Sequence, residues 1–311
     1  MAVRHLISLD DLTDDALYGV VARGAEFSSG QSSPGGLLAG AVAGIYFRRT
    51  STRTRTAFSA GALRLGAGIV TFNGGDLQTN TGESSEDTGR VFSRMLDVLV
   101  ARTSGDPAEL RSWASQSRMS VVNAMTADEH PTQGLTDLTT LLRQFGRIEG
   151  LRVLYLGEGN NTAAALALGL SRFGGTELEL RTPRGYGLTA DVLGRARASA
   201  AAHGSSVVER HDVEGLPVDV DVIYTSRWQT TGTSKEDPDW RERFVPFRIG
   251  EALWEYSPKA MFMHDLPAHR GEEVSAGVLD GPRSIAFAQA ENKMHSAMAV
   301  LEWCRAGGGG A

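Results

Sequence analysis

Hydrophobic positions follow two periodicities along the chain, short apolar runs typical of buried strands and longer stretches with helical spacing. In the first half, strands are expected at 41–47, 68–72, 97–101 and 119–123, and helices at 53–65, 86–95, 107–116 and 131–145. Gly146 predicts the end of the last of these helices, because glycine readily adopts the left-handed conformation that closes helices. The alternation of strands and helices predicts parallel sheets covered by helices.

The second half restarts the same alternation. Strands are expected at 152–157, 177–181, 207–210, 220–224 and 259–263, and helices at 162–173, 189–203 and 289–303. A polar stretch from Ser226 to Phe247 follows neither periodicity, and loops of this length are usually functional or mobile. The tail GGGGA is expected to be flexible. We therefore predict an α/β fold with two domains, 1–147 and 148–288, each a mainly parallel sheet flanked by helices, followed by a closing segment, 289–311.

Composition and charge exclude several classes of protein. A chain of 311 residues exceeds what one compact core usually holds. The net charge of −6 gives no support for a nucleic-acid or anionic-membrane surface. A single cysteine, Cys304, excludes an internal disulfide and fits a reducing compartment. The early charges of MAVRHLISLDDLTDD argue against a signal peptide, and no apolar run has the length of a membrane span. A cytoplasmic location is therefore expected.

The segment FRRTSTRTRTAF lies where a predicted strand ends and a predicted helix begins. A helix N-terminus presents unpaired N–H groups and the positive end of the helix dipole, and so favours anions. Ser51, Thr52 and Thr54 add hydroxyl groups, and Arg53 and Arg55 add charge suited to phosphate oxygens. Taken alone, the segment could equally be a Ser/Thr helix cap followed by a solvated basic turn.

Ser-Thr-Arg-Thr-Arg resembles the carbamoyl-phosphate motif of the aspartate and ornithine carbamoyltransferase family. Further motifs resemble that family in the same order along the chain: ESSEDTGRVFSRMLDVLVAR, DEHPTQGLTDLTTL, MHDLPAHRGEEV and IAFAQAENKMHSAMAVLEW. The third resembles the His-Cys-Leu-Pro loop of ornithine carbamoyltransferases, and the chain is closer overall to these enzymes. The resemblance covers nearly the whole chain.

The resemblance implies an N-terminal carbamoyl-phosphate domain, a C-terminal acceptor domain and a last helix that returns to the first domain. It implies carbamoyl transfer to a small amine without a metal or another cofactor. It also implies a homotrimer, or a multiple of a trimer, with each active site at a subunit interface. Residues from Leu77 to Glu83 would then complete the site of a neighbouring subunit.

The same resemblance assigns roles on the carbamoyl-phosphate side. The catalytic residues would be Arg53, Thr54, Arg102 and His130, of which the last three would donate to the carbonyl oxygen as the tetrahedral intermediate forms. Gln133 would accept from the carbamoyl NH₂, and Leu266 would supply a backbone carbonyl. The complete expected binding set is Ser51, Thr52, Arg53, Thr54, Arg102, His130, Gln133, Leu266 and Lys293, where Lys293 replaces a family arginine.

The acceptor side departs from both branches of the family. Ser226 stands where ornithine enzymes have an aspartate, Arg227 and Gln229 resemble aspartate enzymes, and Asp265 replaces the loop cysteine. The lysine that aspartate enzymes carry is missing near Thr81. The expected acceptor set is Asn161, Ser226, Arg227, Gln229, Thr230, Thr231 and Asp265. We expect a short diamino acid or a derivative of one, although Asp265 could instead cap a turn and Arg227 could pair within the chain.

Three other functions stay open from the sequence. The first is an ornithine carbamoyltransferase of arginine biosynthesis with a variant pocket. The second is a non-catalytic protein that binds carbamoyl phosphate, although all the expected carbamoyl-site side chains are present. The third is a nucleotide-binding dehydrogenase, suggested by GEGNN after a strand, but this string lacks the spacing of the dinucleotide fingerprint.

Overall fold

The computed structural model describes residues 3–230 and 232–307. The chain forms two compact units, unit 1 from Met1–Arg143 with Glu291–Ala311 and unit 2 from Gln144–Ala290. Helices α5 (Pro131–Phe145) and α11 (Ala286–Gly307) each contribute residues to both units. The predicted acceptor residue Thr231 and the end of the GGGGA tail, 308–311, lie outside the described residues.

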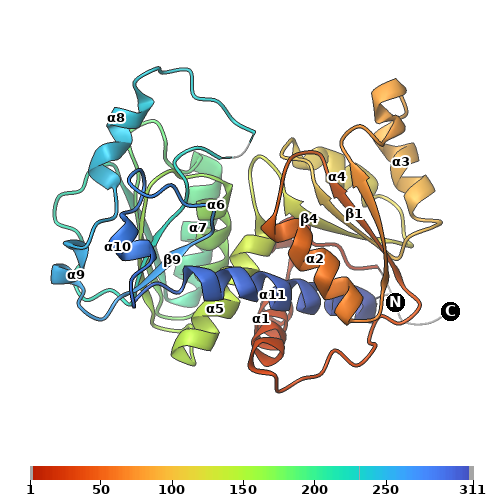
Figure 1. The fold of residues 1–311 in the computed structure, drawn as a ribbon, viewed down its shortest axis with the longest axis horizontal. Coiled ribbons are helices and arrows are strands. Elements are labelled where there is room, and N and C mark those ends of the chain that lie inside the picture. Colours follow the sequence, from red (N-terminus) through yellow and green to blue (C-terminus); the bar gives the residue numbers. More distant parts are fainter. Residues whose placement is uncertain (1–2, 231, 308–311) are drawn as a thin grey trace. The chain divides into compact units, whose positions relative to one another are not determined.

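Unit 1 contains a parallel sheet in the order β2-β1-β3-β4. Its strands are β1 (Val42–Phe47), β2 (Gly68–Asn73), β3 (Val98–Arg102) and β4 (Ser120–Met125). Its other helices are η1 (Leu9–Asp11), α1 (Asp14–Ser29), α2 (Arg53–Arg64), η2 (Gln78–Thr81), α3 (Ser85–Phe92) and α4 (Pro107–Trp113). Figure 1 shows α2 on one side of this sheet and α3 and α4 on the other.

Strands β3 and β4 form because their side chains are buried on both faces, as parallel sheets require. On one face, Tyr46, Leu99 and Val121 pack with Leu110 and Trp113 of α4. The parallel order brings the carboxyl ends of β1, β3 and β4 to one edge of the sheet. These are the ends that lead into the predicted carbamoyl-phosphate motifs.

Unit 2 contains a second parallel sheet, in the order β7-β6-β5-β8-β9. Its strands are β5 (Arg152–Leu156), β6 (Glu177–Arg181), β7 (Ser206–Arg210), β8 (Val222–Thr225) and β9 (Met261–His264). Its helices are α6 (Asn161–Leu170), α7 (Ala190–His203), α8 (Trp240–Phe244), η3 (Val245–Phe247), α9 (Leu253–Tyr256) and α10 (Ala276–Leu279). A core that includes Leu154, Ile223 and Phe262 stabilises the central strands. The predicted fold class is confirmed in both units.

The structure contains helices beyond the predicted ones, among them η1, η2, α9 and α10. Helix α1 buries Leu17, Val20 and Val21, and it is capped by the preceding residue, Thr13, whose side chain accepts from the Ala16 amide. The polar stretch 226–247 contains two short helices, α8 and η3. Among the helices of the described residues, none combines the length and hydropathy needed to cross a membrane.

Candidate active site

The N-terminus of α2 lies at the carboxyl edge of the unit 1 sheet. Thr52, the residue before the helix, makes no capping hydrogen bond with its side chain, whereas Thr54 in the first turn is buried. The alternative interpretation of this segment as a Ser/Thr helix cap is therefore not met at Thr52. The first-turn amides keep the hydrogen-bonding capacity and positive potential that suit an anion.

Arg102 ends β3 beside this helix terminus. Its side chain is buried, and Nη1 donates to Ser51 Oγ at 3.3 Å. The β3–β4 register shifts between Ala101 and Arg102, as it does at a β-bulge, where side chains are commonly re-aimed. The structure thus brings Arg102 and Ser51 together, as the sequence predicted for two residues of one phosphate site.

The loop that carries His130 is anchored by the preceding residue, Glu129, which is buried. Glu129 accepts from Ser8 Oγ at 2.5 Å and from the Leu9 amide at 2.8 Å, which ties the loop before α5 to the N-terminal segment. On the other side, Thr132 Oγ1 lies 3.2 Å from His130 Nδ1. Burial, with smaller contributions from the charges of Lys293 and Arg102, holds the pKa of His130 well below its usual value. The imidazole is therefore neutral at physiological pH and offers one N–H donor.

Gln133 follows His130 on α5 and is fully buried. Its Nε2 donates to Asp137 Oδ1 at 2.7 Å, and its Oε1 accepts from Lys293 Nζ of α11. These two contacts fix the orientation of the amide, with the oxygen toward the lysine. An amide oxygen can accept two hydrogen bonds, so the predicted contact with a carbamoyl NH₂ is compatible with this arrangement.

The predicted site residues of unit 1 that carry a charge are all cations. Arg102 and Lys293 are buried cations, both close enough to His130 to lower its pKa, and the α2 terminus adds a positive potential. Such a site can bind a dianionic phosphate and polarise an adjacent carbonyl oxygen. Arg53 begins α2 and is half-buried, in the position predicted for phosphate binding.

In unit 2, Ser226 directly follows β8 and is buried. Its Oγ lies 2.6 Å from the Tyr155 hydroxyl and accepts from Asn160 Nδ2 at 2.9 Å. Asn160 also caps α6 through its side-chain oxygen. The predicted Asn161 is the first residue of α6 and is buried, so Asn160 is the asparagine that contacts Ser226.

Asp265 lies in the loop after β9. Its Oδ2 accepts from Thr162 Oγ1 at 2.9 Å, and its Oδ1 lies 3.4 Å from His264 Nδ1. Burial works to lower the pKa of His264, but the contacts with Asp265 and Glu273 outweigh it and raise that pKa. The amide of Leu266 donates to His264 Nδ1 at 2.8 Å, and the other ring nitrogen, Nε2, lies 3.3 Å from Glu273 Oε1.

Leu266 itself adopts a φ of 52°, which is unusual for a residue with a branched side chain. Strained backbone of this kind clusters at functional loops, where the surrounding contacts enforce it. The carbonyl of Leu266, predicted to contact the carbamoyl group, is thus held in a defined direction. Its role remains a prediction.

The remaining acceptor candidates lie in the segment after Ser226. Arg227 Nε donates to the carbonyl of Gln229 at 2.6 Å, and Gln229 Nε2 donates to the carbonyl of Thr233 at 2.8 Å. Thr230 Oγ1 donates to Glu158 Oε2 at 3.4 Å. These contacts lie within unit 2 and join the segment to the turn between β5 and α6.

Sequence reasoning missed the residues that support the predicted ones, namely Glu129, Thr132, Asp137, Tyr155 and Asn160. All of these except Tyr155 lie within four positions of a predicted site residue, so their closeness to a motif in the sequence could have indicated them. Tyr155 carried no such signal, because it lies inside a strand and reaches Ser226 only through the pairing of β5 with β8.

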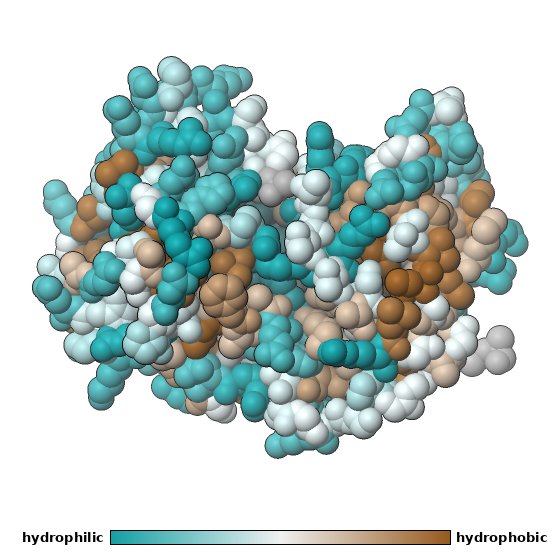
Figure 2. Space-filling model, viewed as in Figure 1, coloured by the Kyte–Doolittle hydropathy of each residue, from teal (hydrophilic) through white to brown (hydrophobic). Residues whose placement is uncertain are grey.

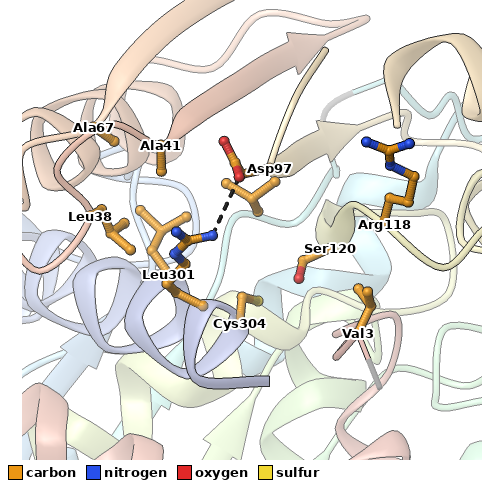
Figure 3. A pocket seen from close by; sticks show the side chains of 11 residues that line it. Val3, Leu38, Ala41, Ala67, Asp97, Arg118, Ser120, Leu301 and Cys304 are labelled. Carbon is orange, nitrogen blue, oxygen red and sulfur yellow. Dashed lines mark hydrogen bonds and ion pairs between the residues drawn. The ribbon is translucent and has the colours of Figure 1, made fainter. Parts of the chain in front are cut away.

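A small cavity of about 50 Å³ lies at the amino edge of the unit 1 sheet, opposite the motifs (Figure 3). Its lining includes Cys304, Ser120 and Asp97, and Arg305 forms an ion pair with Asp97 at 3.4 Å. Burial raises the pKa of the Cys304 thiol to about 12, which makes it a poor nucleophile. This cavity therefore offers no activated nucleophile.

Together, the fold and the α2 site define a two-unit α/β protein with an anion site at the carboxyl edge of its first sheet. Two family models match the chain: "Aspartate/ornithine carbamoyltransferase, carbamoyl-P binding domain" at residues 4–143, and "Aspartate/ornithine carbamoyltransferase, Asp/Orn binding domain" at residues 149–304. The chain belongs to the aspartate/ornithine carbamoyltransferase family.

Similar proteins extend this result over the full length. The chain is 36% identical to an ornithine carbamoyltransferase of Thermococcus kodakarensis, over 97% of this chain and 96% of that protein. It is 33% identical to the enzyme of that name from Bacillus subtilis, over 96% and 93% of the two chains. Among solved structures, the ornithine carbamoyltransferase of Pyrococcus furiosus superposes with a TM-score of 0.90, at 36% identity and 96% coverage of both chains.

Proposed function

We propose that the chain transfers the carbamoyl group of carbamoyl phosphate to a primary amine of a small diamino acid. The observation that carries the proposal is the unit 1 cluster, in which Arg102 contacts Ser51 just before α2 and both Arg102 and Lys293 lie close enough to His130 to lower its pKa. The cluster supplies what carbamoyl transfer needs on the donor side: an anion site, a cation for the carbonyl oxygen and a neutral hydrogen-bond donor.

The reaction balances without a metal or a redox partner. The unprotonated amine attacks the carbonyl carbon, and the negative charge that develops on the carbonyl oxygen is stabilised by Arg102 and His130. The carbon–oxygen bond to phosphate then breaks, and phosphate leaves at the α2 terminus. The leaving phosphate can accept the proton that the amine loses, so the proposal requires no separate side-chain base.

For the acceptor, the relatives named above favour ornithine over the short diamino acid that the sequence suggested first. The short diamino acid remains a second candidate because of one observation. Ser226 is a neutral residue whose hydroxyl is engaged by Tyr155 and Asn160, while a carboxylate, Asp265, lies in the loop after β9. Asp265, and not position 226, would then supply an anion for an ammonium group of ornithine.

An acceptor panel tests the proposal. Purified protein is incubated with carbamoyl phosphate and with ornithine, 2,4-diaminobutyrate, 2,3-diaminopropionate, lysine or aspartate. Phosphate release and a product mass increased by one carbamoyl group are measured together. Ornithine is expected to give the highest kcat/KM. A higher value for a shorter diamino acid would support the second candidate, and carbamoyl phosphate binding without turnover of any amine would overturn the proposed activity.

We also propose that the protein is a trimer, or a multiple of one, in the cytoplasm. Strand β2 is an edge strand with exposed positions, including Val70, and Figure 2 shows an apolar area on the face of unit 1 near it. Exposed apolar edges are typical of protein contacts. Residues Leu77 to Glu83 would extend to the neighbouring site. Sedimentation should give a trimer or its multiple, and mixing an Arg53 variant with a variant lacking the loop should restore some activity. A fully active monomer would contradict this.

A further inference from the structure

Lys235 lies in the polar stretch 226–247, yet its side chain is only 6% exposed. Its Nζ forms an ion pair with Glu158 of the β5–α6 turn. The same nitrogen lies 5.0 Å from the ring centroid of Trp240, 5.4 Å from that of Tyr186 and 5.5 Å from that of Phe244. Lysine ammonium groups are rarely buried unless they are paired, and aromatic faces attract them. We call Glu158 and these three rings the Lys235 cage.

The rings of the cage also pack on one another. The centroid of Phe244 lies 5.0 Å from that of Tyr186 and 5.4 Å from that of Trp240. It lies 5.5 Å from that of Trp228, which is two residues beyond Ser226. The cage therefore joins both ends of the stretch to the segment before α7 that carries Tyr186.

Glu158 connects the cage with the acceptor candidates. One of its carboxylate oxygens pairs with Lys235, and the other accepts from Thr230 Oγ1 at 3.4 Å. Its backbone carbonyl accepts from the Tyr155 hydroxyl at 2.7 Å, and that hydroxyl lies 2.6 Å from Ser226 Oγ. A single network thus runs from Lys235 through Glu158 to both Thr230 and Ser226.

We propose that Lys235 is a positioning residue for the acceptor site. Its ion pair with Glu158, surrounded by the aromatic rings, fixes residues 226–230 and Lys235 against the β5–α6 turn. This holds Arg227, Gln229 and Thr230 in place before the acceptor arrives. Acceptor binding then does not carry the entropic cost of ordering these residues. The role in acceptor binding rests on the proposed carbamoyl transfer, but the role in fixing the stretch does not.

The test compares four single variants. Lys235→Met retains the apolar stem and removes the charge, Glu158→Gln removes the opposite charge, and Lys235→Arg keeps the cation. Lys259→Met is the matched control, because Lys259 is an exposed lysine of the same unit. Amide hydrogen exchange is measured without ligand in peptides covering 226–236 and, as an internal reference, β5.

Lys235→Met and Glu158→Gln are expected to speed exchange in 226–236 about tenfold, with β5 unchanged, whereas Lys235→Arg and Lys259→Met stay near wild type. A double variant that combines Lys235→Met with Glu158→Gln should exchange no faster than the more affected single variant, because both changes remove the same interaction. With an active acceptor, the acceptor KM should rise about tenfold while the carbamoyl-phosphate KM and kcat change less than twofold.

Wild-type exchange in both Lys235→Met and Glu158→Gln would overturn the proposal. Faster exchange with equal increases in both KM values would limit Lys235 to general stability and would overturn its role in acceptor binding. If no acceptor is turned over by the wild type, the proposed function fails, but the exchange experiment still decides whether Lys235 fixes the stretch.

Discussion

The proposed donor site of unit 1 and the proposed acceptor stretch of unit 2 are built in different ways. The donor residues stand at the ends of regular elements: Ser51 before α2, Arg102 at the end of β3, and His130 before α5. The acceptor candidates from Ser226 to Thr230 stand on irregular chain after β8 and are held by side-chain contacts. A site on regular elements keeps one geometry, whereas a site on irregular chain can change by substitution without disturbing a sheet.

The two regions also differ in how their charges are balanced. The donor site gathers two buried cations, Arg102 and Lys293, near a neutral histidine, and the amide of Gln133 contacts both Lys293 and the carboxylate of Asp137. The acceptor region pairs its charges internally, Lys235 with Glu158 and Asp265 with Thr162 and His264. The donor site is therefore suited to one anion, whereas the acceptor region can alter its selectivity through a few polar substitutions.

The largest effect should come from the donor site. Arg53→Ala removes a cation at the start of α2, and losing a charge-assisted contact to a transferring phosphate should reduce kcat/KM by about 10³-fold or more. Steady-state phosphate release measures this loss, and circular dichroism checks that the fold is retained.

Arg64→Ala is the matched control for that variant. Arg64 is the last residue of the same helix and is exposed, about 17 Å from Arg53 at 1.5 Å per residue. It should change kcat/KM less than threefold. Near wild-type turnover in Arg53→Ala would show that the α2 terminus does not bind the phosphate. The contrast between a donor site at the ends of regular elements and an acceptor site on irregular chain would then fail.

A paired substitution in the acceptor region should change selectivity. Ser226→Asp places a carboxylate where Tyr155 and Asn160 already offer donors, so the new charge is hydrogen-bonded despite its burial. Combined with Asp265→Cys, it should raise the ratio of kcat/KM for ornithine over 2,3-diaminopropionate by about tenfold. A competition assay with both amines measures the ratio directly, and an unchanged ratio would exclude these two positions from acceptor selection.

Arg227→Ala should act on one substrate alone. If Arg227 binds the acceptor's carboxylate, its loss should raise the acceptor KM about tenfold and leave the carbamoyl-phosphate KM unchanged. Arg283→Ala, which removes an exposed arginine of the same unit outside the stretch, provides the control. An Arg227→Ala variant in which both KM values rise together would indicate that this arginine supports the fold of the stretch, through its bond to Gln229, more than it binds substrate.

The sequence predicted the donor side in greater detail than the acceptor side for a physical reason. In unit 1, β1 and β2 lie within one residue of the predicted bounds and the helix 131–145 has them, because their apolar periodicity continues without interruption. Ser51, Arg102, His130, Gln133 and Lys293 were all predicted, and the structure places these residues in contact or close enough to affect one another electrostatically. Their positions follow from where strands and helices end.

The Lys235 cage could not be predicted in the same way. Its members come from Glu158, Tyr186, Lys235 and α8, separated along the chain by lengths that follow no period. Side-chain contacts of this kind depend on how irregular chain folds back on the sheet, which local propensity does not determine. The contact of Ser226 with Asn160, where Asn161 was expected, has the same origin, since a turn decides which of two adjacent asparagines faces β8.

A smaller effect should follow from the charges around His130. Lys293→Met removes one of the two cations that lower the pKa of His130, so that pKa should rise toward its ordinary value while burial and Arg102 still hold it down. Histidine titration by NMR would measure the shift. Arg143→Met, on a later turn of α5, is the control and should leave the His130 titration unchanged. A fall in the His130 pKa in Lys293→Met would contradict the assigned cause.

The smallest effect is on stability, and its sign is fixed by the same pKa. Folded His130 stays neutral, whereas in the unfolded chain it titrates near the ordinary value of about 6.5. Below that pH the unfolded state binds a proton that the folded state does not, so the free energy of unfolding should fall by up to about 1.4 kcal/mol per pH unit as the pH decreases. The raised pKa of His264 has the opposite effect on the free energy of unfolding as the pH decreases. This effect is the same in the wild type and in His130→Asn. The difference between these two proteins in urea unfolding, measured from pH 7.5 to 5.5, therefore isolates His130. The variant should lose less stability than the wild type on acidification, and parallel curves for the two proteins would show that His130 is not held neutral in the folded donor site.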